Sequence, residues 1–342
     1  MPAPRHHVII GSGSAGFGAA TTLRARDPDC RISLVTLSSL PFYNRYDLPR
    51  IFKGCHDWRD LLPIMPAKYD ELGITLRRNS RVVDVDGKAQ LVLFAHNERL
   101  HYDCLLVCAG GRGYLPEILA DQRHLMHDFA SFEAAMKVHD ALPRRGTVIM
   151  LGGDMLGIDL ALNLLETGYK VTLITTPQTF WPHRVDDDTH ARLIAALEDK
   201  GVRVVGGSTP VAVEEGPPNG SARRVVLQDG TEIAGDVVMP FCGLVPAVEF
   251  MLSAGVDIER GLLVRPDLRT TGENIWAAGD VCQIWSDKEK EYKFYHGWRN
   301  VRYMGELAAR NMTGSDEEFK AGKDRGIWLD DDNAIQSSFW EN

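Results

Sequence analysis

The segment His7-Val-Ile-Ile-Gly-Ser-Gly-Ser-Ala-Gly16 is a short apolar run that leads into glycines spaced Gly11-x-Gly13-x-x-Gly16. An alanine-rich stretch with helical spacing follows, and a second apolar run begins at Ile32. This order predicts a strand, a tight loop, a helix and a second, parallel strand. Gly11 would make the turn, Gly13 would let a pyrophosphate approach the backbone, and Gly16 would let the helix pack on the strand. Because a helix N-terminus offers free N–H groups to phosphate, the segment predicts a dinucleotide-binding loop.

A second segment of the same kind, Thr147-Val-Ile-Met-Leu-Gly-Gly-Asp-Met-Leu-Gly157, is followed by an apolar run from Val171. Here Asp154 stands where the close-approach glycine is expected. Two like charges about 5 Å apart at an effective dielectric of ~20 repel by roughly 3 kcal/mol. That repulsion corresponds to roughly a hundredfold in affinity. Two interpretations therefore stay open: a weakened nicotinamide loop, or a loop that only packs a helix on a strand.

The carboxylate that usually holds the ribose at the end of the second strand is missing from both segments. The first reads Val35-Thr-Leu-Ser38 and the second reads Ile174-Thr175-Thr176-Pro. Ser38 or Thr175 would make a weaker contact with the ribose. No arginine directly follows Thr176 to hold a 2′-phosphate, so the sequence indicates neither NAD nor NADP.

The composition narrows the function classes. The 342 residues carry a net charge of −9, with 44% hydrophobic and 25% charged residues, which is typical of a globular protein. An acidic balance argues against nucleic acid as a partner. The most apolar run, Val237–Leu252, has 16 residues with two prolines and Glu249, so no membrane span is predicted. The six cysteines are scattered without a C-x-x-C pair, and Met1 to His7 is too short and too polar for a signal peptide to be predicted. We therefore predict no metal site and a cytoplasmic location.

Several further motifs resemble one family, the pyridine nucleotide–disulfide oxidoreductases, which are flavoproteins with two dinucleotide domains. Within the family, the chain is most similar to the ferredoxin and rubredoxin reductases and to the flavin part of assimilatory nitrite reductases. The resemblance runs from about residue 5 to 314. It rests on Gly11 to Gly16, Pro41-Phe-Tyr-Asn-Arg45, Cys108-Ala-Gly110, Gly243-Leu-Val-Pro246, Thr271-Gly-Glu-Asn-Ile-Trp-Ala-Ala-Gly-Asp280 and the helix-like run from Trp298 to Gly314.

The resemblance implies an α/β fold with two Rossmann-like three-layer domains, the second inserted in the first. The FAD-binding domain would comprise residues 1–114 and 246–315, and the NAD(P)-binding-like domain residues 115–245. Residues 316–342 would form a C-terminal tail that is either frayed or docked on the protein, and Phe339 and Trp340 favour docking.

The resemblance also implies FAD in the first domain and assigns residues to it. Val82 would contact the adenine through its backbone, Gly110 and Arg112 would lie near the adenosine, and Asp280 near the ribityl chain. The full cofactor-binding set is Gly11, Ser12, Gly13, Ser14, Ala15, Gly16, Ser38, Arg45, Arg50, Val82, Ala109, Gly110, Arg112, Gly279, Asp280 and Trp298, with Gly152, Gly153, Gly157 and Asp159 for a nicotinamide dinucleotide.

Arg50 is the one predicted catalytic residue. It stands where the similar branch often has a lysine near the flavin, and a cation there would stabilise negative charge on the ring. Two simpler interpretations stay open: Arg50 as a solvated surface arginine, and Asp280 as a helix N-cap.

Three departures from the family pattern matter. Ser38 falls where related reductases carry a redox cysteine, so thiol–disulfide chemistry is not expected. The second glycine loop is altered at Asp154, although Asp159 stands where the family often has a glutamate near the nicotinamide. Only 27 residues (316–342) remain where the family's dimerisation domain would begin.

Three hypotheses follow for function. The first is an FAD-dependent oxidoreductase that passes electrons between NAD(P)H and an iron–sulfur or ferredoxin-like protein. The second is an FAD-containing electron-transfer subunit of a larger hetero-oligomeric redox complex, with a weak or lost nicotinamide site. The third is a relic that binds an adenine nucleotide without redox chemistry.

Overall fold

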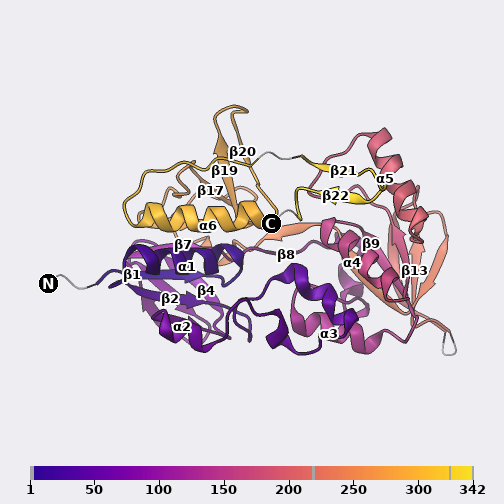
Figure 1. Cartoon of the computed structure of the whole chain (residues 1–342), viewed down its shortest axis with the longest axis horizontal. Coiled ribbons are helices and arrows are strands. Elements are labelled where there is room, and N and C mark those ends of the chain that lie inside the picture. Colours follow the sequence, from indigo (N-terminus) through magenta and orange to yellow (C-terminus); the bar gives the residue numbers. More distant parts are fainter. Residues whose placement is uncertain (1–3, 218–219, 323–324, 341–342) are drawn as a thin grey trace.

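The computed structural model describes residues 4–217, 220–322 and 325–340, and Figure 1 shows them as two lobes side by side. The first lobe is built on a parallel sheet with the strand order β18-β7-β1-β2-β3. Its strands are β1 (His6–Ile10), β2 (Arg31–Val35), β3 (Ile74–Arg77), β7 (Cys104–Val107) and β18 (Ile275–Ala277). Strand β18 comes late in the chain yet completes this sheet, so the first lobe is made of separate stretches of sequence.

Two helices lie side by side against this sheet, α1 (Ser14–Arg26) and α6 (Trp298–Met312) (Figure 1). They approach closely because both carry glycines at the crossing. A Cβ atom on Gly305 would lie 2.0 Å from the carbonyl oxygen of Ala15. The pair therefore packs backbone against backbone.

Smaller elements complete the first lobe. An antiparallel sheet contains β4 (Val82–Asp86), β5 (Leu91–Phe94) and β6 (Arg99–His101). Another sheet contains β17 (Leu262–Val264), β19 (Cys282–Ser286) and β20 (Glu291–Lys293), the last two forming a hairpin. Its short helices are α2 (Ala67–Glu71) and η4 (Glu249–Met251), whereas η1 (Arg45–Lys53) and η2 (Trp58–Leu61) pack on the core of the second lobe.

The second lobe repeats the parallel plan with the strand order β11-β10-β9-β15. Its strands are β9 (Thr147–Gly152), β10 (Lys170–Ile174), β11 (Arg203–Val205) and β15 (Val237–Phe241). Its helices are η3 (Glu117–Leu125), α3 (Phe132–Ala141), α4 (Met155–Glu166) and α5 (Asp187–Asp199). A separate antiparallel sheet contains β12 (Pro210–Glu215), β13 (Arg223–Leu227) and β14 (Glu232–Gly235).

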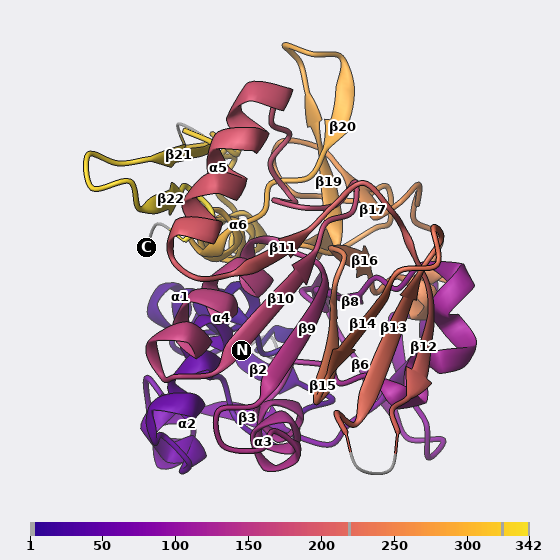
Figure 2. The same ribbon diagram turned by 90° about the vertical axis from the view of Figure 1, so that its right-hand side faces the viewer.

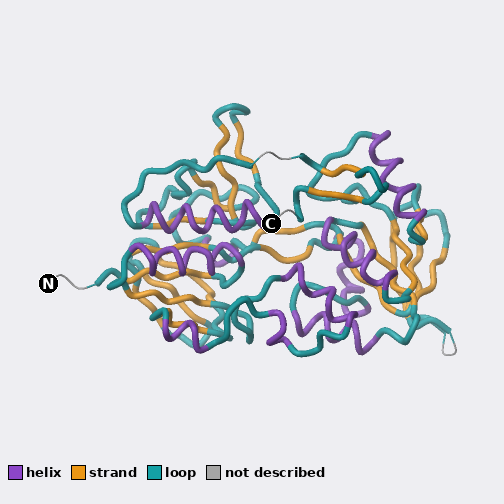
Figure 3. Tube along the Cα trace, in the orientation of Figure 1, coloured by secondary structure: helices purple, strands orange, loops and turns teal. Residues whose placement is uncertain are grey.

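The chain passes between the lobes through two strands that pair with each other. These are β8 (Gly111–Gly113) and β16 (Leu244–Pro246), which lie between the two lobes (Figure 3) and pair in antiparallel orientation. The last described stretch forms a hairpin of β21 (Ile327–Leu329) and β22 (Ile335–Ser337), which lies beside α5 of the second lobe (Figures 1 and 2).

The predicted fold class is confirmed, because two parallel sheets carry helices in the β-α-β order. The core strands are mostly apolar and are buried along nearly their whole length, as in sheets covered on both faces. The division at residues 114, 246 and 315 is compatible with these sheets and stays a prediction. None of the helices in the described ranges combines the length and apolar character that a bilayer crossing requires.

Candidate functional site

The first glycine loop connects β1 to α1 and has no room for side chains at its turn. Gly11 has φ +106°, and a Cβ there would lie 2.1 Å from the carbonyl oxygen of Cys108 at the end of β7. A Cβ on Gly16 would lie 1.8 Å from the carbonyl oxygen of Gly11. Both glycines are therefore required by the backbone itself, before any ligand is considered.

Gly13 differs from its neighbours because the space around it is open. It is the N-cap residue of α1, no side chain caps the helix, and a Cβ on Gly13 would meet nothing within 4 Å. The first N–H groups of α1 thus lack a side-chain acceptor and lie beside free space. This is the arrangement that accepts a phosphate at a helix N-terminus.

The structure brings several predicted residues of the first lobe to this loop. Ala109 follows β7, and its nitrogen would lie 3.0 Å from a Cβ on Gly11. Gly279 follows β18, and a Cβ there would lie 3.5 Å from the Cβ of Ala15. The loop, the end of β7 and the end of β18 therefore meet at one edge of the sheet, where ligands of such folds bind.

The N-terminus of α6 is a second helix end in the first lobe without a side-chain cap. Its N-cap is Gly297, and no side chain caps the helix. The indole Nε1 of Trp298 is buried without a hydrogen-bond partner. A buried donor without a partner is costly, so the site fits a ligand that offers an acceptor atom.

The second glycine loop, which connects β9 to α4, has a similar backbone turn, but a carboxylate lies at the start of its helix. Gly152 has φ +100°, and a Cβ there would lie 2.2 Å from the carbonyl oxygen of Phe241. Asp154 is the N-cap residue of α4: its Oδ1 accepts from the N–H of Gly157 at 2.9 Å, and its Oδ2 accepts from the N–H of Gly243 at 3.1 Å. The chain's own carboxylate thus occupies donors that a phosphate would use.

Asp154 is held in an unfavourable setting for a charge. Its side chain is buried, and burial raises the pKa of this carboxyl to about 6, although the backbone N–H groups of Gly157 and Gly243 act in the opposite direction. Burial also raises the pKa of Asp159, one turn further along α4, to about 6, with Lys53 opposing the shift. Both groups are therefore harder to ionise than an exposed aspartate.

The two lobes meet around Tyr46 on η1. Burial and the negative charges of Asp280 and Asp154 raise the pKa of its phenol. The ring of Phe339, near the end of the described chain, packs edge-on against Tyr46, with 5.5 Å between centroids. Tyr46 thus lies between Asp280 of the first lobe, Asp154 of the second glycine loop and the last described segment of the chain. Sequence reasoning missed it, although it directly follows a motif that carried the family resemblance.

Asp280 is bonded to a residue that the sequence did not indicate. Its Oδ1 lies 2.7 Å from Nδ1 of His296, and the imidazole ring lies 4.6 Å from the ring of Trp181 in the second lobe. His296 directly precedes the N-terminus of α6. This hydrogen bond and ring contact therefore connect the two lobes at the start of α6.

Four further residues that the sequence predicted at the cofactor site are exposed or engaged in local contacts. Arg45 and Arg50 are exposed on η1, and Arg112 forms an exposed ion pair with Glu249. Ser38 is engaged in a turn, where its Oγ accepts from the N–H of Leu40. The catalytic role of Arg50 and the other assignments of cofactor contacts stay predictions.

A cavity of about 450 Å³ opens at the end of β10. Its lining includes Thr175, Thr176 and Pro177, where the sequence indicated a ribose contact, and Ser208 and Asp229 from the neighbouring loops. The cavity thus lies at the edge of the second sheet that would receive the adenosine half of a dinucleotide.

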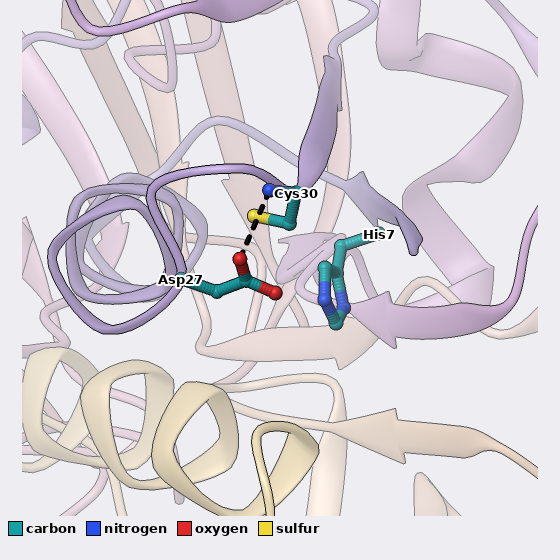
Figure 4. Close-up of side chains that lie close together, drawn as sticks. All are labelled: His7, Asp27 and Cys30. Carbon is teal, nitrogen blue, oxygen red and sulfur yellow. Dashed lines mark hydrogen bonds between the residues drawn. The ribbon is translucent and has the colours of Figure 1, made fainter. Parts of the chain in front are cut away.

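One cluster of potential metal ligands lies at the other end of β1, formed by His7, Asp27 and Cys30 (Figure 4). Their ligand atoms lie within 4.8 Å of one another, and burial lowers the pKa of His7 to about 4. The guanidinium of Arg24, however, reaches to 3.9 Å from the Cys30 sulfur and donates to the carbonyl of Asp27. Because a positive charge already lies beside the thiol, a divalent cation would be repelled.

The cysteines offer no dithiol. All six lie in described parts of the chain, and all are free. Burial raises the pKa of Cys108 and Cys282, so these thiols are poor nucleophiles.

Comparison with known proteins agrees with this geometry. A family model described as pyridine nucleotide-disulphide oxidoreductase matches residues 5–303. A rubredoxin-NAD(+) reductase of Alcanivorax borkumensis is 29% identical over 285 residues, which cover 81% of this chain and 72% of that protein. The ferredoxin–NAD(+) reductase component of a biphenyl dioxygenase system from Paraburkholderia xenovorans is 27% identical over 304 residues, 89% of this chain and 74% of that protein.

A solved structure shows the same fold. The ferredoxin reductase of the CYP199A2 system from Rhodopseudomonas palustris superposes with a TM-score of 0.84 at 22% identity, covering 93% of this chain and 78% of that one.

Proposed function

Because this chain belongs to the pyridine nucleotide-disulphide oxidoreductase family, we propose that it is an FAD-dependent oxidoreductase that moves electrons between a nicotinamide dinucleotide and an iron–sulfur or ferredoxin-like protein. The observation that carries the proposal is the open first loop, where α1 begins at Gly13 without a side-chain cap. The free cysteines support a route without a redox-active disulfide.

Two helix N-termini of the first lobe would bind different parts of FAD. The N-terminus of α1 and the backbone of residues 11–16 would hold the pyrophosphate, with Ala109, Gly110 and Gly279 beside them. The N-terminus of α6 and the unpaired Nε1 of Trp298 would meet the flavin end. When bound, FAD supplies the exchange between a two-electron donor and one-electron carriers.

The protein side chains near the lobe junction would control position and charge. Asp280, fixed by His296, would orient the flavin end of the cofactor. Tyr46 would exclude water between the lobes, and its raised pKa keeps the phenol neutral. Arg50 is exposed on η1, and its positive charge would lie near the flavin, on the side open to a partner protein. A cytoplasmic location is part of this proposal, supported by the six free thiols.

One observation favours a second candidate, an FAD-containing electron-transfer subunit of a larger redox complex. The Asp154 carboxylate accepts from the N–H groups of Gly157 and Gly243 beside the second loop, which weakens the case for a nicotinamide as the donor. Electrons would then enter and leave the flavin through protein-borne iron–sulfur centres.

One experiment tests the shared claim and separates the two candidates. The purified protein is reconstituted with FAD, its visible spectrum is recorded, and it is titrated anaerobically with NADH, NADPH or dithionite. An oxidised [2Fe–2S] ferredoxin is then added, and bleaching of the carrier is followed. Reduction by a nicotinamide supports the oxidoreductase. Reduction by dithionite alone, followed by transfer to the ferredoxin, supports the subunit. A folded protein that retains no FAD contradicts both.

A further inference from the structure

We propose that residues 325–340, here called the tail segment, close the second dinucleotide site together with Asp154. A nicotinamide dinucleotide would then occupy that site only after residues 339 and 340 of the tail segment have left it. The inference rests on the proposed function, because it concerns the access of a nicotinamide to the flavin.

The tail segment is bonded to the start of α4, which is the helix that would receive a pyrophosphate. The indole Nε1 of Trp340 donates to the carbonyl oxygen of Met155 at 3.1 Å. Met155 is the first residue of α4 and directly follows Asp154. Trp340 therefore lies against the mouth of the second glycine loop, next to the carboxylate that already caps it.

The preceding residue reaches the other helix end. The ring of Phe339 packs on Tyr46, and a Cβ on Gly297 would lie 3.2 Å from the carbonyl oxygen of Phe339. Gly297 is the N-cap residue of α6. Two adjacent residues, 339 and 340, thus touch the N-terminal ends of α6 and α4.

A dinucleotide on the second loop would have to follow the same path. Its pyrophosphate would lie at the start of α4, and its nicotinamide would extend towards the flavin end at the start of α6. The tail segment spans these two helix ends with its own aromatic side chains. Ligand and segment therefore compete for the same space.

The part of the tail segment that precedes these two residues is anchored to the second lobe. Ile327 and Ile335 are buried in the core cluster of that lobe, and Ser337 Oγ lies 2.7 Å from Nε2 of His183. Strand β21 lies against α5 (Figure 2). Residues 339 and 340 can therefore detach while the hairpin stays in place, so only a short stretch needs to move.

The test uses the full-length FAD-loaded protein and the oxidised nucleotides NAD⁺ and NADP⁺, which bind without reducing flavin. Their dissociation constants are measured calorimetrically for the wild type, Trp340→Ala and a deletion of residues 325–342. Trp285→Ala is the matched control, because Trp285 lies on the β19–β20 hairpin and bonds to Asp287. We expect about tenfold tighter binding for Trp340→Ala and at least as much for the deletion.

Hydrogen exchange of the wild-type protein provides a second readout. We expect saturating nucleotide to increase exchange at residues 337–340, because the ligand displaces them. Tail amides that stay equally protected, with a Trp340→Ala affinity within twofold of wild type, would overturn the proposal even if the deletion does not fold. Absence of nucleotide binding in an Asp154→Gly, Trp340→Ala double variant would overturn it as well. Transfer from dithionite-reduced protein to ferredoxin does not involve the segment, so failure of that step would contradict the proposed function alone.

Discussion

The two glycine loops share a backbone turn but differ in the charge at the start of the helix that follows. In each, a glycine with positive φ lies against the carbonyl of a neighbouring strand, 2.1 Å from a hypothetical Cβ at Gly11 and 2.2 Å at Gly152. Yet α1 starts at an open glycine, whereas α4 starts at a buried carboxylate that accepts two backbone N–H groups. Packing a helix on a strand and binding a phosphate are therefore separable properties of this loop.

The largest effect separates these two properties within the first loop. In Gly11→Ala the new Cβ would clash with the Cys108 carbonyl, so we expect loss of the folded state. In Gly13→Ala the Cβ enters open space, so the protein should fold but bind FAD more weakly. Circular dichroism and the FAD-to-protein ratio of the purified variants measure both. A Gly13→Ala protein as unstable as Gly11→Ala would contradict the separation.

The next variant converts the first loop into the second. Gly13→Asp places a carboxylate at the N-terminus of α1, where it can cap the helix as Asp154 caps α4. We expect a folded protein whose FAD affinity falls by roughly a hundredfold, because like charges about 5 Å apart repel by roughly 3 kcal/mol at an effective dielectric of ~20. Fluorescence titration of the apoprotein with FAD measures the loss. Gly13→Asn is the control, and an equal loss in that variant would assign the effect to size and not to charge.

A pH effect on stability follows from the buried carboxyls of α4. The pKa values of Asp154 and Asp159 are both raised to about 6 in the folded protein, whereas an unfolded aspartate titrates near 4. The folded state therefore holds protons that the unfolded state releases, so these groups lower the free energy of unfolding as pH rises from about 4 to about 6.

Asp154→Asn should reduce the loss in the free energy of unfolding between pH 4 and pH 6, by at most about 3 kcal/mol. Urea unfolding at several pH values between 4 and 7.5 measures the slope. Asp186→Asn is the matched N-cap variant, on the exposed start of α5, and it should leave the decrease at least as steep. An Asp154→Asn slope equal to that of wild type would show that the carboxyl does not titrate in this range.

The smallest effect is a gain of function in the second loop. In Asp154→Asn the amide oxygen can still accept from Gly157, while the charge is removed. We expect NAD⁺ to bind about tenfold more tightly, less than the full charge repulsion because the cap still occupies one donor. Calorimetry measures the change, again with Asp186→Asn as the control. Unchanged affinity would mean that the carboxylate is not what limits this loop.

The sequence was sufficient to predict the parts whose cause is local. The glycine spacing, the apolar runs and the aspartate in the second loop each stand within a dozen residues, and each lies in the element expected. The sequence did not indicate Tyr46, His296 or Trp181, because their roles depend on contacts between distant segments, such as the contact of Trp181 with His296. The tail was expected to dock through Phe339 and Trp340, and the aromatic residues do pack against the protein. Its three-residue strands and its position between the helix ends had no periodic signal that could predict them.

The close contact between α1 and α6 fixes the distance between the N-termini of these two helices. Gly305 rests on the backbone of Ala15, so the two helices cannot slide past each other without a clash. The N-termini of both helices, which lack side-chain caps, are therefore held at a constant separation. A ligand that engages both ends must match that span, so we expect the first lobe to distinguish a flavin dinucleotide from a flavin mononucleotide by reach, whatever contacts its rings make.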